Sequence, residues 1–97
     1  MSERVCYFNG RIIPERDAKV SIFDSALQVG DMAFEVTRTC RHKPFRLEAH
    51  LDRLFHSLSV LRIDPGVSRA ELLEISLETL ARNLQTAGSE IDWNLMH

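Results

Sequence analysis

The sequence lacks the hallmarks of several large classes of protein. No apolar run approaches the ~20 residues that a helix needs to cross a bilayer, so no membrane partner is expected. The net charge is −2 and no basic block occurs, which argues against nucleic acid as a partner. The N-terminal segment has no apolar stretch typical of a secretory signal. Cys6 and Cys40 are too few for a disulfide framework, so we expect reduced and partly buried thiols in a cytoplasmic protein.

What is present fits one small domain of 97 residues. Short segments rich in β-branched and aromatic residues predict strands. Asn9-Gly10 is a strong hairpin signal between the first two of them. The segment 24–33 contains Asp, Ser and Gly and predicts a loop that can hold one helical turn. The predicted strands are 4–8, 11–13, 18–23, 34–40, 45–47 and the end of the chain from residue 91.

Two amphipathic helices are predicted in the second half of the chain. The first runs from 47 to 62, with leucines at spacings of three and four and Pro65-Gly66 behind it. The second opens at Ser68 with a capping box completed by Glu71, and Gly88 is its expected stop. Its expected buried stripe is Leu73, Leu77, Leu80 and Leu84. Strands followed by helices predict an α+β fold, an antiparallel sheet with both main helices packed on one face.

The first helix carries polar residues beside its leucine stripe. His50, Arg53 and Ser57 share one flank at the boundary between core and solvent. A guanidinium there suits a phosphate or carboxylate, because its planar fork can pair with two oxygens. From helix geometry alone, a surface ion pair of Arg53 with Asp52, Glu48 or a neighbouring strand is the better-supported interpretation.

The predicted strand 34–40 places a second set of side chains in one row. Phe34, Val36, Arg38 and Cys40 alternate onto one face, and Glu35, Thr37 and Thr39 onto the other. An aromatic, a small apolar side chain and an arginine can line a pocket of the kind that binds small molecules. A half-buried strand whose Arg38 pairs with a carboxylate explains the same residues without a ligand.

The histidines give no metal site. His42, His56 and His97 share no helical or strand spacing that would bring them together. His50 fits a hydrogen bond near Arg53 better than it fits a catalytic base.

Several motifs in order resemble those of the fold-type IV pyridoxal-phosphate enzymes. This family includes the branched-chain and D-amino acid aminotransferases and aminodeoxychorismate lyase. The resemblance covers about residues 7–63, with the motifs Asn9-Gly10, Asp24, Gly30-Asp31, FEVTR at 34–38 and FRLEAHLDRLFHS at 45–57. It implies that 1–97 forms the small N-terminal domain of such an enzyme.

The resemblance assigns roles to particular residues. It implies that Arg53 binds the phosphate of pyridoxal 5'-phosphate and that Phe34, Val36, Arg38 and Val29 line the substrate pocket. Branched-chain enzymes usually carry tyrosine at the place of Val29 and glycine at that of Val36. The FEV form is closer to the D-amino acid or amine transaminases.

The chemistry of this family needs a lysine that forms a Schiff base with the cofactor. Lys19 lies in a predicted strand and Lys43 in a predicted turn, and neither matches it. We therefore assign no catalytic residue and expect the large domain with that lysine to be absent, so that the chain alone is inactive and retains cofactor weakly. The implied partners of the whole enzyme are an amino acid, a 2-oxoacid and a second copy in a homodimer. The alternatives are a lyase of the aminodeoxychorismate type and a non-catalytic binding module.

Overall fold

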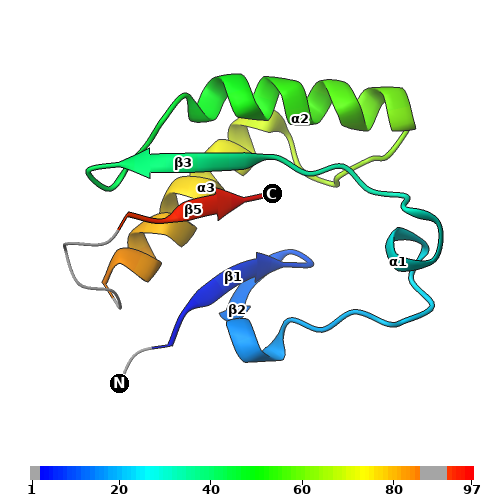
Figure 1. Ribbon diagram of the computed structural model, residues 1–97, viewed down its shortest axis with the longest axis horizontal. Helices are drawn as coiled ribbons and strands as arrows, with labels where there is room; N and C mark the ends of the chain where they lie inside the picture. Colours follow the sequence, from blue (N-terminus) through cyan, green and yellow to red (C-terminus); the bar gives the residue numbers. More distant parts are fainter. Residues whose placement is uncertain (1–2, 86–91) are drawn as a thin grey trace.

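The computed structural model describes residues 3–85 and 92–97 and has the predicted α+β class (Figure 1). Within these residues no helix is both long and apolar enough to cross a membrane. Gly88, the predicted helix stop, lies outside them. The elements are β1 (Val5–Phe8), β2 (Arg11–Pro14), a 3₁₀ turn η1 (Glu15–Asp17), α1 (Ser25–Val29), β3 (Val36–Cys40), β4 (Lys43–Pro44), α2 (Leu47–Leu61), α3 (Arg69–Leu84) and β5 (Asn94–Met96).

The strands form two antiparallel sheets instead of a single one. β1 and β2 make the predicted hairpin, in which Asn9 and Gly10 both adopt positive φ as a tight two-residue turn requires. The second sheet has the order β4-β3-β5. In it Val36 lies opposite Met96 and Thr37 lies opposite Leu95. The predicted C-terminal strand therefore forms, and it covers one edge of β3.

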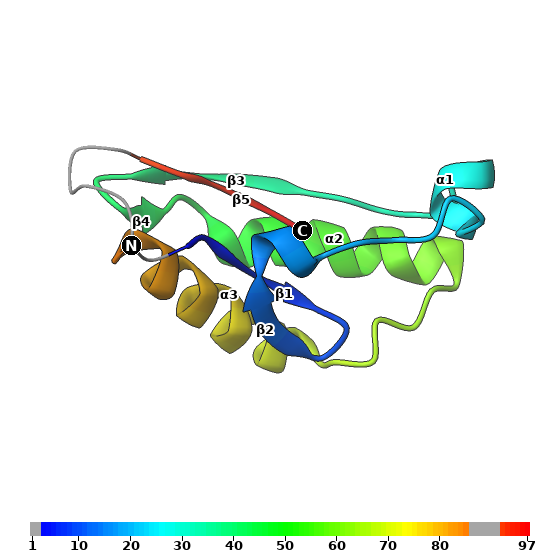
Figure 2. The same cartoon turned by 90° about the horizontal axis from the view of Figure 1, so that it is seen from below.

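The core lies where α2 and α3 pack against the second sheet. Both helices lie on the same side of β3 and β5 (Figure 2). Along β3 the side chains of Glu35, Thr37 and Thr39 are buried and those of Val36, Arg38 and Cys40 are exposed, which confirms the predicted alternation. The buried leucines of α2 form the apolar cluster, namely Leu47, Leu51, Leu54 and Leu58.

Two strand predictions were wrong. Segment 18–23 forms no strand, because no other strand in the described part of the chain pairs with it, and Phe23 is 80% exposed. The predicted strand 45–47 is replaced by β4, two residues earlier. Arg41 and His42 both adopt positive φ, so the chain reverses within two residues and Lys43 pairs at once with Cys40.

The predicted helix bounds are close to the observed ones, but some residues that were expected to be buried are exposed. The capping box of Ser68 and Glu71 is present, and α2 and α3 begin at the predicted positions. Leu61, which ends the leucine repeat of α2, and Leu77, which was expected in the buried stripe of α3, are each 45% exposed. The face of α3 that packs inward also carries polar residues, because Asn83 bonds to both backbone groups of Val5. Cys40, expected to be partly buried, is exposed on the outer face of β3.

Candidate functional site

The site is built on the flank of α2 that faces the beginning of β3. Buried Leu51 and Leu54 fix the rotation of α2 against the sheet. Because residues three apart lie side by side on a helix, His50 and Arg53 then point to the same place. That place is Glu35, the residue just before β3. Two backbone bonds of 2.9 Å each, between Glu35 and His97, hold Glu35 in the sheet.

Glu35 joins the two residues of the helix. Its side chain is only 10% exposed, and its Oε1 lies 2.8 Å from His50 Nδ1. Its Oε2 lies 3.4 Å from Arg53 Nη2. A carboxylate accepts hydrogen bonds only, so His50 donates from Nδ1 and its Nε2 is then free of the proton when the ring is neutral. A buried acid is satisfied here by one hydrogen bond and one ion pair.

Arg53 is the exposed member of the cluster. Its side chain is 73% exposed, and Glu35 is its one ion-pair partner among the described residues. A guanidinium has five N–H donors in a plane. Most of these donors therefore face outward, in position to receive an anion with oxygen acceptors. The ion pair of Arg53 with a neighbouring strand segment, which helix geometry favoured, is therefore present. It leaves most of the guanidinium donors available to an anion.

The predicted pocket residues lie apart from Arg53. Val36 and Arg38 project from the outer face of β3, whereas Glu35 projects from the face that α2 covers. Phe34 is 62% exposed and Val29, in α1, is 77% exposed. α1 lies at one end of the molecule, beyond the start of β3 (Figures 1 and 2). Within the described residues, the structure gathers Phe34 and Val36 next to Glu35 along the chain but does not enclose them in a pocket with Arg53.

A second polar pair, the half-buried His97 and the buried Ser76, borders Glu35. His97 Nε2 lies 2.7 Å from Ser76 Oγ, and the hydroxyl of Ser76 also donates to the carbonyl of Leu72 at 2.6 Å. Because the Ser76 hydroxyl donates its proton to Leu72, it can only accept from His97. His97 therefore donates from Nε2, and in the neutral ring Nδ1 carries no proton. Burial lowers the pKa of His97; the Glu35 charge opposes this effect and His50 adds to it. Burial therefore favours the neutral form of the His97 imidazole.

Glu35 is the residue that sequence reasoning missed. It was placed on the face opposite the pocket row and given no role. A signal was available: an acidic residue alternates onto the buried side of a strand, and a helix with His and Arg three residues apart follows. His50 was expected to hydrogen-bond near Arg53, and its bond to Glu35 confirms this.

The lysines lie away from the site. Lys19 is exposed in the segment after η1. Lys43 is exposed in β4, which pairs with the end of β3, whereas Glu35 precedes the beginning of that strand. Neither amine contacts Arg53 or Glu35, and we assign no catalytic role to either.

Comparisons with known proteins identify the family. Residues 32–95 match the family described as amino-transferase class IV. The chain is 43% identical over 77 residues to a putative branched-chain-amino-acid aminotransferase of Methanocaldococcus jannaschii, which covers 79% of this chain and 27% of that protein. It is 39% identical to aminodeoxychorismate lyase of Bacillus subtilis, over 79% of this chain and 26% of that protein. It is 32% identical to D-alanine aminotransferase of Staphylococcus haemolyticus, over 84% of this chain and 29% of that protein. The chain therefore spans about a quarter of the length of these relatives.

Proposed function

The chain belongs to the class IV aminotransferase family, and we propose that it forms the N-terminal part of a pyridoxal-phosphate-dependent aminotransferase. The substrates of the whole enzyme would be an amino acid, of the branched-chain or D-amino acid type, and a 2-oxoacid. The relatives of both names support this substrate range. A cytoplasmic location stays a prediction.

The observation that carries the proposal is the outward-facing guanidinium of Arg53. It is tethered on one side by Glu35 and open on the other, with its side chain 73% exposed. Such a group fits the phosphate of pyridoxal phosphate, because a dianion can accept several N–H donors at once. Bound pyridoxal phosphate would supply the electron sink for the amino acid carbon that loses its proton.

This chain's own residues would bind and orient, and they would not carry out the chemical step. Arg53 would hold the phosphate, and the rigid packing of Leu51 and Leu54 would keep α2 in place beneath it. Phe34 and Val36 present apolar surface on the outer face of the sheet, apart from Arg53, and a role for them in contacting the substrate side chain stays a prediction of the family resemblance.

We also propose that the whole enzyme is a homodimer. The outer face of the second sheet supports this, because Val36 and Met96 lie opposite each other on it and are 38% and 71% exposed. Exposed apolar side chains of this kind are commonly covered by another protein surface.

The test of the site is Arg53→Ala, with binding of pyridoxal 5'-phosphate compared with that of pyridoxal. We expect the affinity for the phosphorylated compound to fall by about 1–3 kcal/mol, roughly fivefold to 150-fold, and that for pyridoxal to change little. Arg11→Ala, which removes an exposed arginine from β2, is the matched control. Equal losses for both compounds, or equal effects of both variants, would contradict the assignment.

A lyase of the aminodeoxychorismate type is the second candidate, and the 39% identity to such an enzyme favours it. In the protein that carries this chain, amine release that needs a 2-oxoacid indicates the aminotransferase. Release without any acceptor indicates the lyase.

A further inference from the structure

Arg53 needs a restraint if it is to hold a phosphate, because a long exposed side chain is otherwise free to take many rotamers. Ordering an arginine side chain on binding costs rotamer entropy, which weakens the binding. α2 provides no such restraint, since Arg53 has no ion-pair partner on its own helix in the described chain. The ion-pair contact of the guanidinium comes instead from Glu35, the residue just before β3.

Glu35 is well suited to supply this restraint. Its backbone is fixed by the two hydrogen bonds to His97, and its side chain is only 10% exposed. The 2.8 Å bond from His50 fixes the rotation of the carboxylate, since one oxygen is committed to the imidazole. The other oxygen is thereby turned toward Arg53, 3.4 Å from Nη2.

We propose that Glu35 is a positioning residue for Arg53 and that His50 holds Glu35 in the orientation that this role requires. The proposal rests on the proposed function, because it treats Arg53 as the phosphate-binding group. Glu35 itself would not touch the phosphate. It would fix one end of the guanidinium, so that the outward N–H donors are already ordered when an anion arrives.

A different role for Glu35 would predict the opposite change in the affinity for an anion. If its charge merely offset that of Arg53, removal of the charge would strengthen anion binding, because the guanidinium would be left with its full attraction for phosphate. If Glu35 positions Arg53, removal of the charge weakens anion binding. The direction of the change in affinity therefore separates the two roles.

The test is Glu35→Gln, which keeps the size of the side chain and removes its charge. We expect the affinity for pyridoxal 5'-phosphate to fall roughly twofold to fivefold, as for the loss of one partly exposed ion pair, and the affinity for pyridoxal to stay unchanged. Glu48→Gln is the matched control, because Glu48 lies on α2 and pairs with Arg69 instead. Unchanged or tighter binding by Glu35→Gln would overturn the proposal.

The second measurement needs no ligand. Nuclear magnetic resonance relaxation of the Arg53 side-chain Nε–H group, in the ligand-free chain, reports how strongly the guanidinium is restrained. We expect faster and wider motion of this group in Glu35→Gln than in the wild type and no change in Glu48→Gln. If the wild type does not prefer pyridoxal 5'-phosphate over pyridoxal, the proposed function fails, and this measurement still decides whether Glu35 positions Arg53. Equal Arg53 motion in the wild type and in Glu35→Gln would refute the positioning role.

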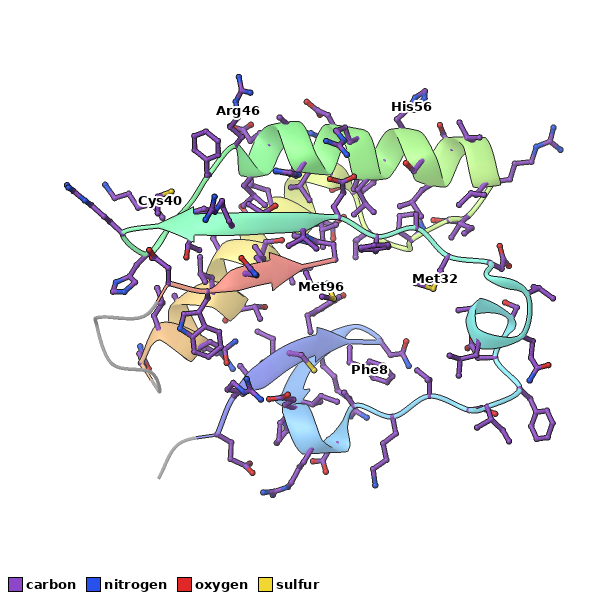
Figure 3. The ribbon with its side chains drawn as sticks, in the orientation of Figure 1. Phe8, Met32, Cys40, Arg46, His56 and Met96 are labelled. Atoms are coloured by element: carbon purple, nitrogen blue, oxygen red, sulfur yellow. The ribbon has the colours of Figure 1, made fainter. Side chains whose placement is uncertain are left out.

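His50 provides a rescue test. His50→Asn places an amide N–H near the position of Nδ1 and should retain the restraint on Arg53, whereas His50→Ala should lose it. His56, on the outer side of the same helix (Figure 3), gives the control His56→Ala, which should leave Arg53 unaffected. Equal Arg53 motion in His50→Asn and His50→Ala would show that the bond to Glu35 does not matter.

Discussion

The rigidity of α2 depends on how deeply its leucines are buried, and Leu51→Ala tests this directly. Leu51 is 0% exposed and lies at the centre of the leucine cluster. Replacing a buried leucine by alanine costs about 2–5 kcal/mol, because the lost transfer free energy is joined by the cost of the cavity left behind. In a domain of this size that corresponds to a fall in melting temperature of roughly 10–25 °C.

Leu77→Ala is the matched comparison. Leu77 lies in the middle of α3, so the exchange has the same helix propensity effect, but the side chain is 45% exposed. With about half of the area buried and little cavity formed, we expect a cost near 1 kcal/mol. The sequence pattern of α3 alone would predict equal costs for the two leucines.

The assay is urea and thermal unfolding followed by far-ultraviolet circular dichroism. It reports the free energy of unfolding of each variant and the slope of that energy with denaturant. The reasoning requires Leu51→Ala to cost at least about 1 kcal/mol more than Leu77→Ala, as the two estimates above imply. Equal costs would mean that the leucine cluster does not hold α2 on the sheet and that its support of Arg53 is not rigid.

Two further predictions concern the helix start and pH. Ser68→Ala removes the side chain that accepts from the Glu71 N–H at 3.1 Å, and we expect a loss of about 1 kcal/mol in urea unfolding; no loss would mean that the cap does not stabilise α3. Burial lowers the pKa of His97 from its usual 6.5, beside Glu35 and His50, so the unfolded chain takes up a proton first as the pH falls. The free energy of unfolding should therefore decline below about pH 6.5, and more steeply in the wild type than in His97→Gln. The control variant His56→Gln, at an exposed site, should keep the wild-type slope. Equal slopes in all three proteins would contradict a lowered pKa of His97.

The parts of the fold that sequence reasoning found are those fixed by local chemistry. Asn9-Gly10 dictates its hairpin because both residues tolerate positive φ. The capping box of Ser68 and Glu71 marks the beginning of α3 to the residue. The leucine repeat of α2 predicted its length and four of its buried leucines, because the repeat matches the helical period, whereas Leu61, the last leucine of the repeat, is 45% exposed.

The parts that were missed depend on neighbours that a local pattern does not contain. Segment 18–23 alternates like a strand, yet a strand needs a partner and the described chain offers none there. Leu77 fits the leucine stripe of α3, yet β1 and its bonds to Asn83 turn a partly polar face inward. Glu35 was given no role, because its partners His50 and Arg53 come from α2, which lies over it only in the folded chain. In each case tertiary contacts override a correct local rule.

The motif FEVTR explains why only part of the site was predicted from the sequence. In an extended segment, successive side chains point to opposite faces. Phe34, Val36 and Arg38 therefore share the outer face, and Glu35 alone reaches inward to His50 and Arg53. A short motif can in this way serve two purposes at once, with apolar surface on one face of the sheet and an anchor for the phosphate-binding arginine on the other. Moving the acid by one residue would place it on the outer face and leave Arg53 without its restraint, so the alternation itself is what the site requires.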